Sequence, residues 1–457
     1  MIPTSLNKIL FLALIIVWSA CANTEQTTQK ENASSTKSSE TLVTFAENIP
    51  PLKQREGKLA DAPEWSSIWE EGQNLYQKVR MTGDAKSALL LAAVYMQEAR
   101  ITGDHPYYYN AALDVLNVVG EQPQRDKILN YQALTSKGSV YLSQHQFDKA
   151  LAIGKDALKI ETKDAQVYGV LCDANLELGN YEEAVKMADK MVSIKPDLRS
   201  YARISYLREL FGDYEGAVDA LELAIAAGIP GHENTAWARH TLANLMLDYG
   251  KTAQAKEQLE GCLKERPTYA FAIATLADIA LKENNIAEAE KLTDKACALM
   301  PEFSFFVTKA KIQKAKGEMA AFDKTRNELL VMMKEDTESG HNMNLETASI
   351  YLDLFEDTDK AMAYAEQEYK KRPGNIEVNK LMGEILFESE KYDQAIGYFD
   401  IASKTKWSAP DLLCLSGLSL CKKGDMVKGK EKLALALKYE DSLEKELVEQ
   451  SKKFMTL

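Results

Sequence analysis

Apolar side chains recur at helical spacing in two short runs between residues 165 and 196. The apolar positions are Leu171, Leu178, Val185, Ala188 and Val192. Gly179-Asn180 separates the two runs, and Pro196 ends the second one, because these residues interrupt a helix. The segment therefore predicts two amphipathic helices joined by a short turn. Such a pair cannot bury its apolar face alone and must stack on copies of itself.

The same pattern repeats along most of the chain, with turns 33 or 34 residues apart wherever nothing is inserted. The expected turns lie at His145, Gly179, Gly212, Gly250, Asn284, Gly317, Glu356, Glu390 and Gly424. A small residue follows most turns at a fixed distance, at Ala150, Ala184, Ala217, Ala255, Ala289, Ala361, Ala395 and Gly429. After Gly317 the larger Phe322 occupies that place. This regularity predicts about ten stacked helix pairs.

The unit between residues 165 and 196 resembles the tetratricopeptide repeat in its length and in the order of its elements. The residues that carry the resemblance are Tyr168, Leu171, Gly179, Tyr181, Ala184 and Pro196. Cys172 and Ala188 depart from the family, which usually has glycine and often has an aromatic residue at these places. The resemblance implies an all-α, right-handed superhelical solenoid. In that family the first helix of each pair lines a concave groove that binds other molecules.

The repeats leave segments at both ends of the chain that need a separate interpretation. We expect a signal peptide over residues 1–20, a lipidated and disordered tether over 21–60, an N-terminal capping helix over 61–84, about ten repeats over 85–440, and a C-terminal capping helix over 441–457. The segment His105–Tyr109 is expected to lengthen the turn that follows Gly103. Few apolar residues occur between Ala22 and Leu59, which is typical of a chain that cannot form a core.

The first twenty residues have the form of a secretory signal, with Lys8 before an apolar run that reaches Trp18. This run is about half the length of a helix that spans a bilayer. Small residues before Cys21 resemble a bacterial lipobox, in which Cys21 would carry the lipid, although Trp18 stands where that signal has an aliphatic residue. Ordinary cleavage after Ala22 is the alternative. We expect a lipoprotein of the bacterial cell envelope, with the outer membrane favoured if the cell has one.

Charge and cysteine content narrow the possible partners. The formal net charge of −13 argues against a nucleic-acid partner, because phosphate binding needs a basic surface. Five cysteines follow Cys21 without forming a CxxC pair, at Cys172, Cys262, Cys297, Cys414 and Cys421. Each lies inside a helical segment, so we interpret them as small core residues rather than as disulfides or metal ligands.

No motif in the chain predicts catalysis. Gly250-Lys251-Thr252 resembles the end of a phosphate-binding loop, but Leu245 stands where that loop requires glycine. His232 begins like a metalloprotease motif, but no second histidine follows at the required spacing. We therefore expect a protein that is not an enzyme and that holds no cofactor or metal.

The candidate partner-binding residues lie on the first helices of the central repeats, facing the expected groove. They are Tyr206, Trp237, His240, Asn244 and Phe271. Aromatic rings among amide and imidazole donors are typical of peptide-recognition hot spots, although core packing explains Trp237 equally well. Other groove-facing positions include Glu177, Asp353, Glu384, Phe387 and Glu388. For a single charged residue among these, a solvated helix face is the simpler interpretation.

Together these observations predict an envelope scaffold that binds a protein or peptide in a concave groove and contacts the membrane through its lipid anchor. An envelope lipoprotein that binds glycan or peptidoglycan through the same aromatic surface is the alternative. An enzyme is a distant third interpretation.

Overall fold

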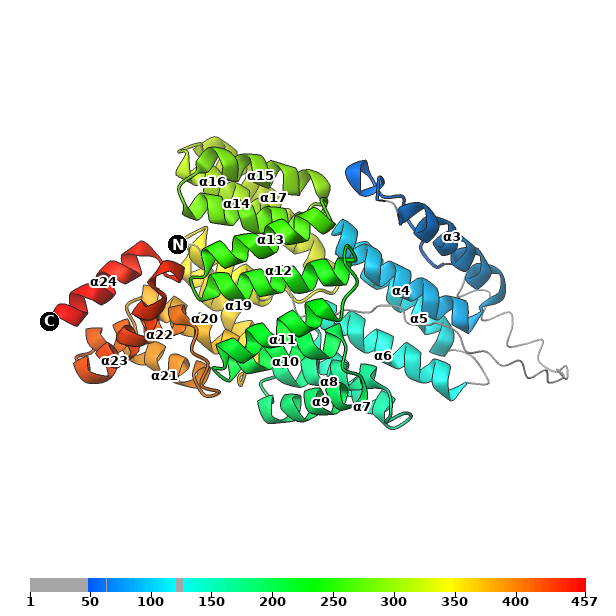
Figure 1. The fold of residues 1–457 in the computed structure, drawn as a ribbon, viewed down its shortest axis with the longest axis horizontal. Coiled ribbons are helices and arrows are strands. Elements are labelled where there is room, and N and C mark those ends of the chain that lie inside the picture. The colour runs from blue at the N-terminus through cyan, green and yellow to red at the C-terminus, as the bar shows by residue number, and fades with distance from the viewer. Residues whose placement is uncertain (1–47, 63, 121–125) are drawn as a thin grey trace. The chain divides into compact units, whose positions relative to one another are not determined.

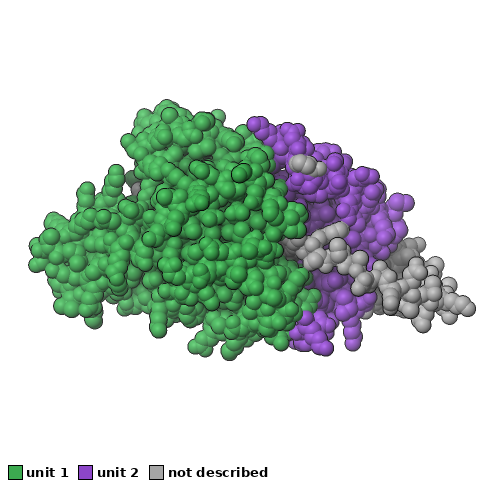
Figure 2. All heavy atoms as spheres, viewed as in Figure 1, with its two compact units in different colours: residues 1–12, 164–457 green, residues 13–163 purple. Residues whose placement is uncertain are grey.

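The computed structural model describes residues 48–62, 64–120 and 126–457 (Figure 1). These residues form 22 α-helices, α3 to α24, with two short 3-10 helices and no strand, which confirms the all-α prediction. None of the described helices has the length and apolar character needed to cross a membrane. The predicted signal peptide and the candidate lipidation site Cys21 lie outside the described residues. The helices divide into two compact units (Figure 2).

The N-terminal unit covers the described residues up to Lys163. Its elements are η1 (Gly57–Leu59), α3 (Trp65–Thr82), α4 (Ala85–Thr102), α5 (His105–Gly120), α6 (Lys127–Ser143) and α7 (Phe147–Leu158). Helices α4 and α5 form one pair, and α6 and α7 form the next. Helix α3 packs on α4, which is the position expected for a capping helix.

Residues 48–60 belong to this folded unit, contrary to the prediction that the tether extends to residue 60. Ile49 and Leu52 are buried in the core that α3, α4 and α5 form. The guanidinium of Arg55 donates two hydrogen bonds, of 2.8 and 2.7 Å, to the buried carboxylate of Glu98. The segment is polar overall, so its composition predicts a tether, but the few residues that pack on the helices hold it in the folded unit.

The segment His105–Tyr109 is the beginning of α5, not the lengthened turn that the sequence suggested. Its tyrosines hold the segment before α3. Tyr107 donates a hydrogen bond of 2.5 Å to the carbonyl of Pro51, and Tyr95 of α4 donates one of 2.5 Å to Pro50. The run of aromatic residues therefore serves the attachment of residues 48–60.

The C-terminal unit covers residues 164–457 and contains the remaining eight helix pairs. Their first helices are α8 (Ala165–Glu177), α10 (Leu198–Leu210), α12 (Glu233–Asp248), α14 (Ala270–Lys282), α16 (Phe303–Ala315), α18 (Asn344–Asp353), α20 (Ile376–Glu388) and α22 (Pro410–Lys422). Their second helices are α9 (Tyr181–Ile194), α11 (Tyr214–Ala226), α13 (Thr252–Glu265), α15 (Ile286–Leu299), α17 (Met319–Glu338), α19 (Thr358–Lys371), α21 (Tyr392–Ala402) and α23 (Met426–Ala436). Among the described residues, the two units together contain the ten pairs that the spacing predicts.

The backbone confirms every predicted turn. All nine turn positions have a positive φ, including four that are not glycine: His145, Asn284, Glu356 and Glu390. The alanines that follow the turns are fully buried, because the two helices of each pair approach most closely there. At the irregular repeat, Phe322 is 5% exposed and takes the same place.

The end of the chain differs in detail from the single capping helix predicted for residues 441–457. A 3-10 helix, η2 (Leu437–Ser442), precedes α24 (Lys445–Thr456). Helix α24 packs on α22 and α23 (Figure 1). Ser451 is fully buried, and its hydroxyl lies 3.3 Å from the Sγ of Cys414. The segment therefore covers the last pair, as expected for a cap.

The five described cysteines are free, and four of them are buried. Burial raises the pKa of the Cys262 thiol to about 12 and that of Cys414 to about 11. The thiols are therefore protonated at neutral pH and poor nucleophiles. No group of three His, Cys, Asp or Glu residues within the described ranges is arranged to hold a metal ion.

Candidate functional site

Three of the five predicted partner-binding residues come together where α12 meets α14. The Nε2 atom of His240 lies 2.7 Å from the hydroxyl of Thr275 and 3.4 Å from the amide nitrogen of Asn244. The ring centroids of His240 and Phe271 are 6.1 Å apart. Burial lowers the pKa of His240 to about 3, so the imidazole is neutral. Thr275, which is not among the predicted partner-binding residues, fixes the orientation of this ring.

The candidate residues on α12 and α14 differ in how much of each side chain is exposed to solvent. His240 and Asn244 are buried, with exposed fractions of 1% and 8%, so they hold α12 against α14. Phe271 and Trp237 are half-buried and keep part of their rings accessible. The ring of Phe271 also contacts Phe305 in the core, at a centroid distance of 5.4 Å.

Tyr206 lies apart from this cluster. Its hydroxyl donates a hydrogen bond of 2.8 Å to Glu377 at the start of α20, which is 171 residues later in the chain. The surrounding core contains residues from α8–α10 and from α20–α22, among them Leu176, Ile376 and Trp407. Tyr206 thus belongs to a contact between early and late repeats of the C-terminal unit.

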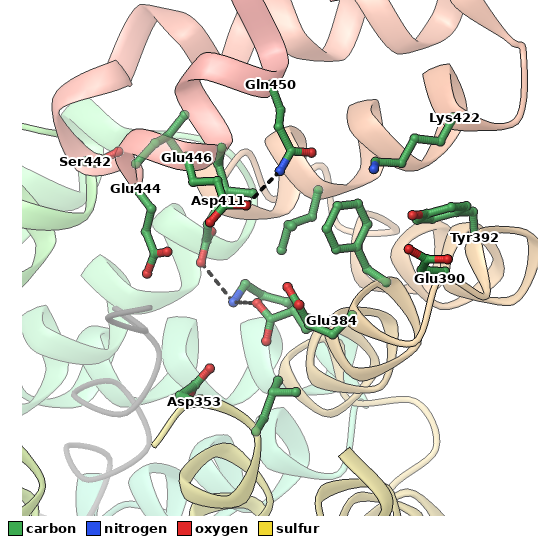
Figure 3. A pocket seen from close by; sticks show the side chains of 17 residues that line it. Asp353, Glu384, Glu390, Tyr392, Asp411, Lys422, Ser442, Glu444, Glu446 and Gln450 are labelled. Carbon is green, nitrogen blue, oxygen red and sulfur yellow. Dashed lines mark hydrogen bonds and ion pairs between the residues drawn. The ribbon is translucent and has the colours of Figure 1, made fainter. Parts of the chain in front are cut away.

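A cavity of about 210 Å³ lies elsewhere in the C-terminal unit (Figure 3). The first helices α18, α20 and α22 contribute one part of its wall, and the segment from η2 to α24 contributes another. Its carboxylates are Asp353, Glu384, Glu388, Glu390, Asp411, Glu444 and Glu446, and its cations are Lys380 and Lys422. We call this cavity the acidic pocket. Figure 3 shows Asp353 and Glu384 facing the carboxylates of the C-terminal segment.

Both lysines of the acidic pocket are already engaged. The ammonium of Lys380 lies 2.5 Å from Glu384 and 2.8 Å from Asp411. The ammonium of Lys422 lies over the rings of Phe387 and Tyr392, at 5.7 and 5.1 Å from their centroids. The lysines therefore offset only part of the negative charge, and the pocket keeps an excess of carboxylates.

Asp353 is the clearest sign of this excess. Its Oδ2 atom is buried and accepts no hydrogen bond from any described residue. Burial, followed by the nearby charge of Glu384, raises the pKa of Asp353 to about 8. Burial also raises the pKa of Glu384 in spite of Lys380, and it raises that of Glu388 together with Glu446 and Glu444. Each of these groups is destabilised when ionised, so a positive charge placed among them would be favourable.

The sequence identified part of this pocket and missed the rest. Asp353, Glu384, Phe387 and Glu388 are among the groove-facing positions that the helical period predicts. The sequence pattern did not identify three further residues of the wall, Lys380, Asp411 and Lys422. The contribution of Glu444 and Glu446 depends on how the C-terminal segment folds back on α22, which local sequence does not determine.

Stacked antiparallel helix pairs with a common turn geometry define a helical-repeat solenoid. Residues 141–208 match the family model described as tetratricopeptide repeat. This region is therefore assigned to the tetratricopeptide-repeat family, as the resemblance of residues 165–196 indicated. No curated protein matches the chain significantly.

Solved structures similar to this chain include a Thermus thermophilus tetratricopeptide-repeat protein, which is 21% identical, covers 43% of this chain and 100% of its own, and has a TM-score of 0.37. Pseudomonas aeruginosa PilF is 18% identical over 56% of this chain and 99% of its own, with a TM-score of 0.35. The human IFIT1 dimer with m7Gppp-AAAA is 13% identical over 88% and 99%, with a TM-score of 0.45. Scores of this size transfer no partner, so the family assignment rests on the repeats themselves.

Proposed function

We propose that the protein is a non-enzymatic scaffold of the bacterial cell envelope that binds a protein or peptide through the inner helices of its repeats. The observation that carries the proposal is the acidic pocket, which first helices of three successive pairs line. Repeat solenoids bind partners on the surface that such helices form. The pocket retains a buried carboxylate oxygen that lacks a hydrogen-bond donor among the described residues, as expected of a surface that a partner completes.

The envelope location rests on the sequence of the first 22 residues. We propose that Cys21 carries a lipid and holds the repeats at a membrane. Metabolic labelling with a fatty acid tests this directly. Wild type should take up the label and Cys21→Ser should not, whereas an unlabelled wild type would support cleavage after Ala22 and a protein without an anchor.

The protein partner is tested by capture from envelope extracts, with and without glycan-degrading treatment. The captured protein is identified, purified and bound again to the full chain. Binding that survives the treatment supports a polypeptide partner. Binding that the treatment abolishes would support the alternative, a glycan or peptidoglycan ligand.

The half-buried ring of Trp237 offers a variant for the same assay. If it contacts the partner, Trp237→Ala should weaken binding by about 2 kcal/mol or more while the melting temperature changes little. Phe211, whose side chain is 41% exposed at the end of α10, provides the matched control Phe211→Ala. A large loss of melting temperature in Trp237→Ala alone would place that ring in the core instead.

A further inference from the structure

We infer that the acidic pocket receives a cationic side chain, lysine or arginine, of the partner polypeptide. The inference rests on the proposed function, because it takes the partner to be a polypeptide. It adds the chemistry by which that partner is recognised.

The charge of the pocket selects a cation. Its wall holds seven carboxylates and two lysines, and both lysines already interact with other groups of the wall. An anion would meet net repulsion in this place, and a neutral group would leave the repulsion among the carboxylates unchanged. A further positive charge would interact favourably with the carboxylates of the wall.

Asp353 shows where the cation would bind. Its Oδ2 atom is buried, lacks a hydrogen-bond donor among the described residues, and lies at the C-terminal end of α18. Figure 3 shows its carboxylate below the side chains of Glu384 and Glu444. An ammonium or guanidinium group supplies several N–H donors, which this oxygen requires. The carboxyl end of a helix carries a partial negative charge, which also favours a cation beside Asp353.

The size and lining of the pocket favour a side chain over a larger molecule. Its volume of about 210 Å³ is smaller than the roughly 300–1,000 Å³ of pockets that enclose drug-sized ligands. Leu352, Leu415 and Leu443 contribute apolar wall beside the carboxylates. Lysine and arginine place their aliphatic stems along apolar surface while the charged end makes polar contacts. The pocket offers both kinds of surface.

A bound metal ion is a poorer match for this pocket. Within the described residues, the carboxylates of the wall do not converge as a set of three that could hold a metal. The alternating apolar and acidic wall suits an extended organic cation better than a bare ion.

Fluorescence anisotropy on the full-length chain in detergent tests the inference. The probes are a fluorescein-labelled hexapeptide that contains two lysines, the same peptide with both ε-amines acetylated, and spermine as a competing free amine. The pocket variant is Asp353→Asn with Glu388→Gln. The matched control is Glu257→Gln with Glu260→Gln on α13, because these exposed residues remove the same charge elsewhere in the unit. Circular dichroism verifies that each variant is folded.

The lysine peptide should bind wild type and the control about equally, and it should bind the pocket variant about tenfold more weakly. Acetylation should cause a similar loss with wild type. Equal loss in both double variants, or equal binding of the acetylated peptide, would overturn the inference. Spermine that binds as tightly as the peptide would also overturn it, because the ligand would then be a free amine.

Binding of the captured envelope protein to wild type and to the pocket variant distinguishes failure of the scaffold proposal from failure of the acidic-pocket inference. Capture that the pocket variant retains would leave the scaffold proposal intact and contradict a role for the acidic pocket. Failure of wild type to rebind any purified polypeptide would contradict the scaffold proposal itself, whatever the peptide assay shows.

Discussion

Arg372, which follows α19, donates a hydrogen bond to Glu177 at the end of α8, 195 residues earlier in the chain. The two side chains are 3% and 6% exposed. The Nε of Arg372 also donates to Glu368 at 2.5 Å, and the amide of Asn375 donates to the carbonyl of Glu177 at 3.0 Å. Early and late repeats of the C-terminal unit are therefore joined directly. Together with the hydrogen bond from Tyr206 to Glu377, this contact provides long-range coupling that is absent from a solenoid whose repeats contact only their neighbours.

Removing Arg372 should be strongly destabilising. Arg372→Met removes the guanidinium that pairs with the buried carboxylates of both Glu177 and Glu368, so we expect a loss of about 3–5 kcal/mol in the free energy of unfolding. Urea unfolding of the full chain measures it. The control is Arg326→Met, which breaks an exposed pair with Asp323 and should cost no more than about 1 kcal/mol. Equal, small losses in both variants would contradict the stabilising role of the contact.

Two turn glycines with the same backbone conformation provide a second test. Gly179 has a φ of 81° and Gly317 has a φ of 75°. A methyl group at Gly179 would overlap the backbone of Gly374 and lie 2.8 Å from the amide of Asn375, whereas one at Gly317 would meet nothing within 4 Å. Gly317→Ala should therefore cost only the left-handed backbone strain, about 1–2 kcal/mol.

Gly179→Ala should cost more than Gly317→Ala, because it also displaces the contact between early and late repeats. Hydrogen exchange at the amide of Ile376, which donates to the hydroxyl of Tyr181 at 2.8 Å, reports on that contact. The amide should lose protection in Gly179→Ala and keep it in Gly317→Ala. Similar protection in both variants would show that the contact tolerates the added methyl group.

Gly179 and Gly317 illustrate which features the sequence predicts: both turns follow from the repeat spacing, but the contact that Gly179 makes with Gly374 does not. The turns, the ten helix pairs and the small residues between paired helices follow from local spacing, so they were predictable residue by residue. The contact at Glu177 was not. The helical period places Glu177 on the groove side, where a solvated carboxylate is the simpler interpretation, and only the superhelical path brings Arg372 to it. The same reason explains why the sequence identified Asp353 as an outward position but did not assemble the acidic pocket.

A larger side chain inserted between two paired helices should reduce hydrogen-exchange protection in the repeats that are coupled to that pair. Ala184 is fully buried between α8 and α9, so Ala184→Leu should cost about 1–3 kcal/mol. Ala184 belongs to the core that includes Phe399 and Trp407, so hydrogen-exchange protection should fall in α20–α22 as well as in α8 and α9. Ala289→Leu is the control, because Ala289 packs in a separate cluster with Ile312. Loss confined to α8–α11 in the first variant would indicate coupling to neighbours only.

Two buried carboxyl groups predict how stability depends on pH. Burial raises the pKa of Asp353 from 3.8 to about 8, and burial together with Asp336 raises that of Glu302 from 4.5 to about 8. Asp353 is also faced by Glu384, Lys311, Lys380 and Glu444, of which the lysines lower its pKa. The folded protein thus holds both protons more tightly than the unfolded chain. Their contribution is fully present near pH 4 and is lost as the pH rises toward 8.

Asp353→Asn and Glu302→Gln keep the shape of these side chains and remove their titration. Each variant should therefore show a shallower fall in the free energy of unfolding between pH 5 and 8, with a difference of a few kcal/mol across the range, since one pKa unit corresponds to about 1.4 kcal/mol. Asp357→Asn is a control of opposite sign. A backbone hydrogen bond from Lys360 lowers the pKa of Asp357, so its contribution is present above the unfolded pKa and disappears as the pH falls. Parallel profiles for wild type and Asp353→Asn in urea unfolding from pH 5 to 9 would show that Asp353 titrates as an ordinary carboxyl group, with the same pKa in the folded and unfolded protein.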